Sequence, residues 1–371
     1  MIKIVTILGA RPQFIKAAAL SRELSRHKGI TEVLVHTGQH YDYRMSDVFF
    51  NELHIPRVTY NLSINGGTHA EMLSAMLSKI ETVLIKEHPD LIIVYGDTNS
   101  TLAGALAAAK IPIPVAHIEA GLRSFDRTMP EEINRMLTDS VSSFLYCPTN
   151  ESKKNLAREN IVHGVPGDVA VRQVGDVMFD VFSDMTQKKM LDYSVFERCG
   201  LQRKDYITAT IHRAGNTDNP RILEKIFSLL NFVAARYKKI VFPVHPRTQA
   251  RLHKSGIAIH REVKLIPPVS YLQMLCLLKH SFCVMTDSGG VQKESFWSKS
   301  PCLIIRNSTE WIELVNAGYN FLIGTDIRQC QNALKKVPFV RYAGLRYNKL
   351  LNEYGNGKTA KKIVRYISHD F

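Results

Sequence analysis

Three acidic residues in the first half of the chain can carry acid–base chemistry: two follow apolar segments and the third opens an expected helix. Asp97 stands in the segment YGDTNS, Glu119 in HIEAGLRS and Glu131 in MPEEINR. Packing explains Glu119 poorly, because carboxylates are seldom buried without a partner or a task. The structural alternatives are a capping turn at Asp97, an ion pair of Glu119 with Arg123 and a helix-dipole contact at Glu131. Together the three carboxylates suit proton transfer at a carbon atom or a leaving group.

The second half of the chain supplies basic and glycine-rich segments that suit a phosphorylated ligand. His212 and His245 each come at the end of an apolar run, followed closely by an arginine. The segment TDSGGVQKE also follows an apolar run, and its glycines let backbone N–H groups approach an anion at a helix start. Glu294, one turn further on, can accept hydrogen bonds from ribose hydroxyls. We expect a nucleotide-diphosphate cradle formed by Ser288, Gly289 and Gly290, the alternative being a plain strand–helix turn.

The amino-terminal motif GARPQFIK, residues 9–16, is a further candidate for binding an anion. Arg11 and Lys16 lie near the start of an expected helix, where a negative ligand is favoured. The motif matches neither the G-x-G-x-x-G pattern nor the P-loop pattern, so it gives no support for a dinucleotide or ATP site of those kinds. The structural alternative is an ordinary turn between a strand and a helix.

Short apolar runs alternate with helical patterns along the whole chain, which predicts parallel sheets in an α/β fold. Two Rossmann-like domains follow from the two series of strands, and ligands are expected in a cleft at the carboxyl ends of those strands. The expected strands are residues 2–8, 32–36, 91–95, 114–117, 144–147, 206–210, 240–244, 263–266, 282–285 and 302–305. We place the domains at residues 1–172 and 173–355, followed by a terminal segment at 356–371.

Composition and charge argue against several classes of function, among them nucleic-acid binding and membrane insertion. The net charge of +14 comes from 48 basic and 34 acidic residues, and the whole excess lies in residues 175–371. The basic residues are scattered, so we expect a polyanionic small substrate or a solvated surface rather than nucleic acid. No apolar run is long enough for membrane insertion, and residues 2–8 predict a buried strand rather than a signal peptide. The six cysteines form no CxxC pair, which indicates reduced core residues in a cytoplasmic protein without a metal site.

These motifs, in this order, resemble those of the non-hydrolysing UDP-N-acetylglucosamine 2-epimerases. The resemblance covers essentially the whole chain, through GARPQFIK, HTGQHYD, YGDTNST, HIEAGLRS, MPEEINR, PVHPRT, TDSGGVQKE and the terminal YGNGKTAKKI. It implies the glycosyltransferase-B fold of two Rossmann-like domains facing a cleft, with the last helix crossing back to the first domain. It also implies a homodimer acting in cell-surface polysaccharide biosynthesis.

The resemblance implies a mechanism that uses neither NAD nor a metal. The anomeric C–O bond breaks and the C2 proton leaves, which yields UDP and a 2-acetamidoglucal; UDP then returns to C1 while C2 is protonated from the opposite face. By motif matching, Asp97, Glu119, Glu131 and His212 are the catalytic residues. The expected contacts to the UDP-sugar are Arg11, Lys16, His245, Ser288, Gly289, Gly290 and Glu294.

Departures from the family pattern bear on the substrate. The branch that acts on UDP-N-acetylglucosamine has R-P-E and T-E-R-P-E, where this chain has Arg11-Pro12-Gln13 and Thr309-Glu310-Trp311-Ile312-Glu313. The pattern resembles more closely the branch with epimerases of UDP-2,3-diacetamido-2,3-dideoxy-D-glucuronate, whose extra carboxylate would suit a basic site. We therefore expect the diacetamido uronate, with UDP-N-acetylglucosamine as the alternative.

Three other activities compete with this interpretation. A glycosyltransferase shares the fold and the nucleotide cradle, a hydrolysing epimerase would release UDP, and a non-catalytic sensor would only bind the nucleotide sugar. The set of Asp97, Glu119 and Glu131 in the first domain favours epimerisation over transfer.

Overall fold

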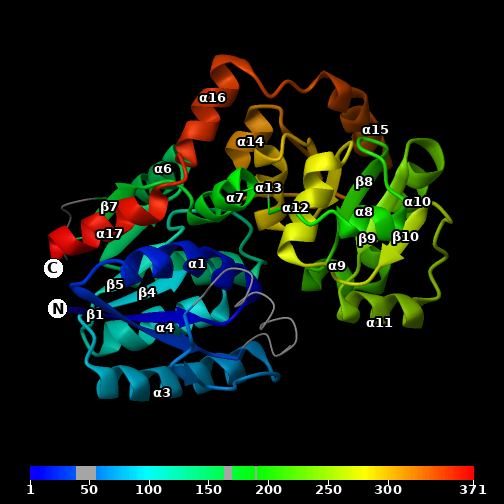
Figure 1. The fold of residues 1–371 in the computed structure, drawn as a ribbon. Helices are drawn as coiled ribbons and strands as arrows, with labels where there is room; N and C mark the ends of the chain where they lie inside the picture. Colours follow the sequence, from blue (N-terminus) through cyan, green and yellow to red (C-terminus); the bar gives the residue numbers. More distant parts are fainter. Residues whose placement is uncertain (39–55, 163–168, 189) are drawn as a thin grey trace. The chain divides into compact units, whose positions relative to one another are not determined.

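The structure of the chain is a computed structural model that describes all residues except 39–55, 163–168 and 189. It forms two compact units, of which unit 1 comprises Met1–Asp184 with Leu351–Phe371 and unit 2 comprises Met185–Leu350. Figure 1 shows each unit as a sheet covered by helices. Part of the motif HTGQHYD lies outside the described residues.

Unit 1 is built on a seven-stranded parallel sheet in the order β3-β2-β1-β4-β5-β6-β7. Its central strands are entirely or almost entirely buried, as expected for a parallel sheet with helices on both faces. The strands are β1 (Ile2–Leu8), β2 (Ile30–His36), β3 (Tyr60–Asn61), β4 (Leu91–Tyr95), β5 (Val115–Ile118), β6 (Phe144–Cys147) and β7 (Ala170–Gln173).

The helices of unit 1 start where the sequence supplies capping groups. Thr68 and Thr98 each accept a hydrogen bond from a backbone N–H in the first turn of the helix that follows. The helices are α1 (Arg11–Ser25), α3 (His69–Glu87), α4 (Asn99–Lys110), α5 (Pro130–Val141), α6 (Asn150–Arg158), α7 (Val177–Gln187, which runs past the unit boundary) and α17 (Thr359–Asp370). One hydrophobic core joins α3 and α4 to the sheet through residues such as Met76, Ile80 and Val94.

Unit 2 has a six-stranded parallel sheet in the order β10-β9-β8-β11-β12-β13. Its strands are β8 (Tyr206–Thr210), β9 (Lys239–Pro243), β10 (Val263–Ile266), β11 (Val284–Thr286), β12 (Cys302–Ile304) and β13 (Asn320–Leu322). Its helices are α8 (Ser194–Cys199), α9 (Ala214–Thr217), α10 (Pro220–Arg236), α11 (Pro246–Ser255), α12 (Tyr271–His280), α13 (Gly289–Trp297), α14 (Ile312–Asn316), α15 (Ile327–Lys336), η1 (Val337–Phe339) and α16 (Gly344–Glu353, which ends beyond the unit boundary). The core under α10 includes Phe227, Leu230 and Phe242.

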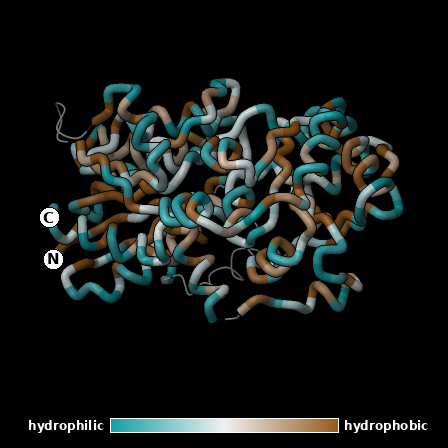
Figure 2. The backbone as a smooth tube through the Cα atoms, turned by 90° about the horizontal axis from the view of Figure 1, so that it is seen from above, coloured by the Kyte–Doolittle hydropathy of each residue, from teal (hydrophilic) through white to brown (hydrophobic). Residues whose placement is uncertain are grey.

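The structure confirms the predicted fold class, with two parallel α/β sheets. Each of the ten predicted strands corresponds to an observed one, with ends shifted by at most two residues. Three short strands of two to four residues, β3, β7 and β13, were not predicted from the sequence. Figure 2 shows the same alternation, with hydrophobic and hydrophilic segments succeeding one another along the described chain.

Helix α17 returns to unit 1 and packs there against α1. Asp180 on α7 fixes its start, because the carboxylate accepts hydrogen bonds from the backbone N–H groups of Thr359 (3.0 Å) and Ala360 (2.7 Å). This contact explains why the segment after residue 172 belongs to unit 1. The structure divides the chain after Asp184 and after Leu350, whereas the predicted boundaries are 172/173 and 355/356.

None of the helices in the described ranges has the length and apolar content that a membrane span requires.

Candidate active site

The start of α1 is fixed by Gln13, the residue at which the sequence departs from the R-P-E pattern. Its Oε1 accepts hydrogen bonds from the N–H groups of Gly9 (2.8 Å) and Ala10 (3.0 Å), and its Nε2 donates to the carbonyl of Tyr95 (2.9 Å). The side chain is buried. An ionised glutamate has no proton to donate to the Tyr95 carbonyl, so glutamine is the better fit here. Arg11 is the first residue of α1.

Lys16 on α1 and Glu119 after β5 form a buried ion pair in unit 1. Glu119 has φ +75°, an uncommon left-handed conformation for a residue other than glycine. Gly96, after β4, lies against the pair: a Cβ atom there would stand 2.9 Å from Lys16 Nζ and 3.3 Å from Glu119 Oε2. Glycine at 96 therefore lets the end of β4 approach the ammonium and the carboxylate. Both members of this pair are among the residues predicted for the site, but their contact with each other could not be predicted from the sequence.

Asp97 is held in place by two residues of α5. Its Oδ2 accepts a hydrogen bond from Arg135 at 2.5 Å, and its backbone carbonyl accepts one from Asn134 Nδ2 at 2.9 Å. Arg135 is buried, whereas the Asp97 side chain keeps 29% exposure. Asp97 therefore presents a fixed, partly open carboxylate at the strand end next to that of Glu119.

The two glutamates at the start of α5 differ in their surroundings. Glu132 is buried and accepts hydrogen bonds from the Ser124 hydroxyl (2.9 Å), the backbone N–H of Phe125 (2.8 Å) and Arg135 (2.7 Å). Glu131, the candidate from the sequence, is half-buried, and its side chain forms no hydrogen bond or ion pair with the described residues. The geometry makes Glu132 the anchor of the preceding loop and leaves Glu131 available for a ligand.

Arg123 does not pair with Glu119, in contrast to the structural alternative considered from the sequence. Its Nη1 donates to Asp139 at 2.7 Å, and its Nε and Nη2 donate to the two carboxylate oxygens of Glu159, each at 2.7 Å. Spacing could not reveal this, because both partners come later in the chain, Asp139 on α5 and Glu159 directly after α6.

Asp287 organises the polar groups at the carboxyl ends of β8 and β11 in unit 2. This fully buried carboxylate accepts hydrogen bonds from the backbone N–H groups of His212 (3.2 Å) and Arg213 (3.0 Å) and from Asn216 Nδ2 (3.0 Å). The His212 ring stands with Nδ1 3.5 Å from Asp287 Oδ1, and its side chain is 51% exposed. Asp287 thus fixes the His-Arg turn while the imidazole stays accessible.

The predicted cradle is the amino end of α13. The Ser288 hydroxyl accepts a hydrogen bond from the N–H of Val291 at 3.4 Å and so caps the helix, and Ser288, Gly289 and Gly290 are partly exposed. A Cβ atom at Gly289 would stand 2.3 Å from Glu310 Oε1, so a larger residue would clash with this segment. Glu310 in turn accepts from Arg306 at 2.8 Å and lies 3.5 Å from Arg213. The helix end and the two arginines make this region suitable for a diphosphate.

The remaining two predicted contacts lie in different surroundings. Glu294 is buried on the second turn of α13, whereas His245 is exposed just before α11.

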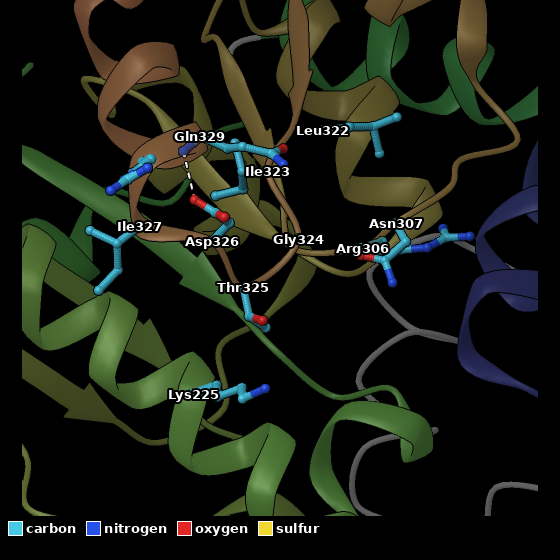
Figure 3. Close-up of a pocket in the computed structure, with 11 residues that line it drawn as sticks. Lys225, Arg306, Asn307, Leu322, Ile323, Gly324, Thr325, Asp326, Ile327 and Gln329 are labelled. Carbon is cyan, nitrogen blue, oxygen red and sulfur yellow. Dashed lines mark hydrogen bonds between the residues drawn. The ribbon is translucent and has the colours of Figure 1, made fainter.

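A pocket of about 730 Å³ opens at the carboxyl ends of β12 and β13 (Figure 3). Arg306 and Asn307 line one part of it, and Gly324 and Thr325 another. Arg306 links the pocket to the cradle, because its guanidinium also binds Glu310.

All six cysteines are free and buried. Burial raises the pKa of Cys276 to about 11 and that of Cys330 to about 12. These thiols are therefore poor nucleophiles at neutral pH, in agreement with their expected role in the core.

Comparison with known proteins identifies the family. A family model described as UDP-N-acetylglucosamine 2-epimerase matches residues 22–368. The chain belongs to this family. A Methanococcus maripaludis protein named UDP-N-acetylglucosamine 2-epimerase homolog is 46% identical over 98% of this chain and 99% of its own length. The UDP-2,3-diacetamido-2,3-dideoxy-D-glucuronate 2-epimerase of Pseudomonas aeruginosa is 44% identical over 99% of both chains.

Solved structures agree with this family of epimerases. The crystal structure of Methanocaldococcus jannaschii UDP-GlcNAc 2-epimerase in complex with UDP-GlcNAc and UDP has a TM-score of 0.88 and 40% identity, covering 99% of this chain and 100% of that one. The chain is thus a UDP-sugar 2-epimerase, an isomerase, as the motifs predict. The family assignment favours epimerisation over the glycosyltransferase and sensor alternatives.

The epimerase departs from the T-E-R-P-E pattern at Trp311, and the structure gives this residue a packing role. Its indole is 2% exposed, and the ammonium of Lys293 on α13 lies 4.2 Å from the ring centroid. Lys293 is itself buried and also lies 5.6 Å from the ring of Trp297. An aromatic face stabilises a buried cation, which an arginine at position 311 would instead repel.

Proposed function

We propose that this epimerase inverts C2 of UDP-2,3-diacetamido-2,3-dideoxy-D-glucuronate, from the gluco to the manno configuration. Two observations support this substrate over UDP-N-acetylglucosamine. The Pseudomonas relative that bears this activity in its name aligns over nearly the whole chain. The chain also lacks the arginine of the T-E-R-P-E pattern, because Trp311 occupies that position beside Lys293. UDP-N-acetylglucosamine stays the alternative, since a solved relative is named for it.

The structural feature that best supports this reaction is the pair of carboxylates at adjoining strand ends of unit 1. Asp97 follows β4 and is paired with Arg135, while Glu119 follows β5 and is paired with Lys16. Each carboxylate therefore has a cation of its own beside it. Epimerisation needs two such groups with opposite roles, since an ionised group must remove the C2 proton and a protonated group must deliver a proton to the opposite face. Glu131 is the third acid–base candidate.

The elimination step breaks the anomeric C–O bond, whose electron pair leaves with UDP, while the C2 proton goes to a carboxylate. The products are UDP and the glucal, and the reverse sequence on the opposite face of C2 gives the epimer. Donors that are fixed beforehand stabilise the charge that develops on departing UDP. We assign this role to His212 and to the backbone N–H groups of Ser288, Gly289 and Gly290. Arg11, Lys16 and His245 are further proposed contacts, with Glu294 on the ribose.

We also propose that the enzyme acts as a cytoplasmic homodimer in cell-surface polysaccharide biosynthesis. Free, buried cysteines suit a reducing compartment. Two apolar side chains on α5, Ile133 (39% exposed) and Leu137 (44% exposed), lie one turn apart on its surface. Apolar groups exposed side by side suit an interface between copies. Light scattering on the full chain, compared with a variant carrying Ile133→Glu and Leu137→Glu, measures the oligomeric state.

Proton NMR in deuterated water tests the proposed substrate. The full chain is incubated separately with the UDP-diacetamido-glucuronate and with UDP-N-acetylglucosamine, and the C2 and anomeric signals are followed. Deuterium at C2 with a new manno-configured UDP-sugar is expected from the first compound. Faster exchange with UDP-N-acetylglucosamine would overturn the proposed substrate, and free UDP without a retained UDP-sugar would indicate hydrolysis.

A further inference from the structure

His117 is fully buried in unit 1, and both of its ring nitrogens face hydrogen-bond acceptors. The residue lies on β5, with Nδ1 2.6 Å from Asp139 Oδ1 and Nε2 2.8 Å from the carbonyl oxygen of Gly96. A backbone carbonyl only accepts hydrogen bonds, so Nε2 must carry a proton.

Asp139 is an acceptor as well. Its Oδ2 accepts from Arg123 Nη1 (2.7 Å) and from the N–H of Gly121 (3.1 Å). Burial raises the pKa of Asp139, but its neighbours outweigh burial, so the pKa lies below its usual value. Two of these neighbours, the Arg123 guanidinium and the Gly121 N–H, favour the carboxylate whatever the state of His117. An ionised Asp139 requires a proton on Nδ1 of His117. The ring therefore donates from both nitrogens, as only the imidazolium can.

This charged ring joins the two turns that carry the candidate carboxylates. The carbonyl of Gly96 belongs to the peptide bond that leads into Asp97. Asp139 holds the N–H of Gly121, two residues after Glu119. Asp139 also lies on α5, the helix whose Arg135 binds Asp97. His117 is thus the link between the end of β4, the end of β5 and α5.

We propose that His117 is a positioning residue that, as a buried imidazolium, sets the turns of Asp97 and Glu119 relative to each other. The inference rests on the proposed function, in which these two carboxylates move the C2 proton. Replacement by a neutral side chain with one correctly placed donor would release either the Gly96 carbonyl or Asp139. A misplacement of about 1 Å costs on the order of 100-fold in rate.

A purely structural role leads to a different expectation. Buried ion pairs contribute little net stability, and apolar replacement of a whole pair is often tolerated. If the His117 ring had only a structural role, its replacement would therefore lower the rate only as far as it also lowers the melting temperature. A positioning ring instead lowers kcat in a folded enzyme that still binds UDP.

The test compares His117→Gln with His280→Gln in the full chain. His280 is the matched control because it is also a buried histidine, but it packs on Phe196 in unit 2. Burial lowers the pKa of His280 to about 4, so its ring is expected to be neutral. Nitrogen NMR of the histidine-labelled wild type at pH 7.5 measures the charge of each ring. The signals of His117 and His280 are assigned because each is missing from the spectrum of the corresponding variant. Kinetics with the preferred UDP-sugar give kcat and KM, and calorimetry gives the affinity for UDP.

We expect two protonated ring nitrogens on His117 and one on His280. His117→Gln should lower kcat on the order of 100-fold, with KM and UDP affinity unchanged, whereas His280→Gln should keep the wild-type kcat. An unprotonated nitrogen on His117, or a wild-type kcat in His117→Gln, overturns the proposal. If that variant does not fold, the wild-type spectrum still decides the charge of the ring, with His117→Asn used for assignment. If the wild-type enzyme exchanges the C2 hydrogen of neither UDP-sugar, the proposed function is contradicted instead. The nitrogen NMR spectrum still measures the charge of the His117 ring in that case.

Discussion

Lys16 and Glu119 form an ion pair in the interior of unit 1, although 102 residues separate them in the chain. The pair brings a residue expected to contact the nucleotide into contact with a residue expected to move a proton. A carboxylate beside an ammonium stays ionised, which suits a base, and the left-handed backbone of Glu119 fixes where its side chain starts.

Glu119→Gln should abolish the exchange of the C2 hydrogen while leaving the fold intact. The amide oxygen can still accept a hydrogen bond from Lys16, but the side chain can no longer take up a proton. Loss of an acid–base group costs about 10²–10⁴-fold in rate. NMR exchange and thermal melting measure the two effects. Full exchange in this variant would remove Glu119 from the acid–base set.

Lys16→Met is the complementary change and should destabilise the enzyme. It leaves the Glu119 carboxylate buried without its cation, which costs about 3–5 kcal/mol for a buried pair. Urea denaturation of both single variants and of the double variant gives the coupling energy. Additive effects in this cycle would show that the two residues do not interact in solution.

Asp287→Asn should weaken UDP binding. The carboxylate accepts from two backbone N–H groups and from Asn216, and an amide would turn an NH₂ group toward at least one of these donors. Each lost hydrogen bond to a charged group is worth about 1.5–3 kcal/mol, so the affinity should fall at least about tenfold. Calorimetry with UDP measures this. Ser288→Ala is the control for a simple loss of a helix cap, at about 1 kcal/mol of stability.

Much of the fold and the identity of the motifs could be predicted from local sequence, because a strand followed by a turn and a helix leaves its pattern in neighbouring residues. The strand ends at Asp97, Glu119 and Thr286 are examples. Partnerships across the fold could not be predicted in this way. Arg123 is close to Glu119 in sequence but binds Glu159 and Asp139.

The sequence also cannot distinguish neighbouring residues of one helical turn whose side chains have different surroundings. Glu131 and Glu132 are adjacent and equally suited to a first helical turn, yet only Glu132 points into the loop that it anchors. The packing of Trp311 on Lys293 likewise depends on α13, which lies earlier in the chain. Burial and direction of side chains, rather than residue type, decide such cases.

Trp311→Arg should destabilise unit 2 and fail to convert the enzyme to the UDP-N-acetylglucosamine pattern. The new guanidinium would face the buried Lys293 ammonium, which the indole now stabilises through its aromatic face. Trp311→Phe keeps an aromatic face and should retain most of the stability. Thermal melting and the ratio of kcat/KM for the two substrates measure the outcome. A stable Trp311→Arg variant with raised activity on UDP-N-acetylglucosamine would make Trp311 a specificity switch.

Asp180 should make the docking of α17 dependent on pH. Burial raises the pKa of Asp180 to about 6, although the N–H groups of Ala360 and Thr359 partly offset this. Because the folded pKa lies above the unfolded value of about 3.9, protonation favours the folded state. The stabilising effect is complete below about pH 4 and disappears as the pH rises past about 6, a change of about 3 kcal/mol. Asp180→Asn cannot titrate, so the stability of the wild type minus that of the variant should fall by most of this amount between pH 4 and 7. Urea denaturation at four pH values measures the difference, and a difference independent of pH would show that Asp180 titrates normally in the folded protein.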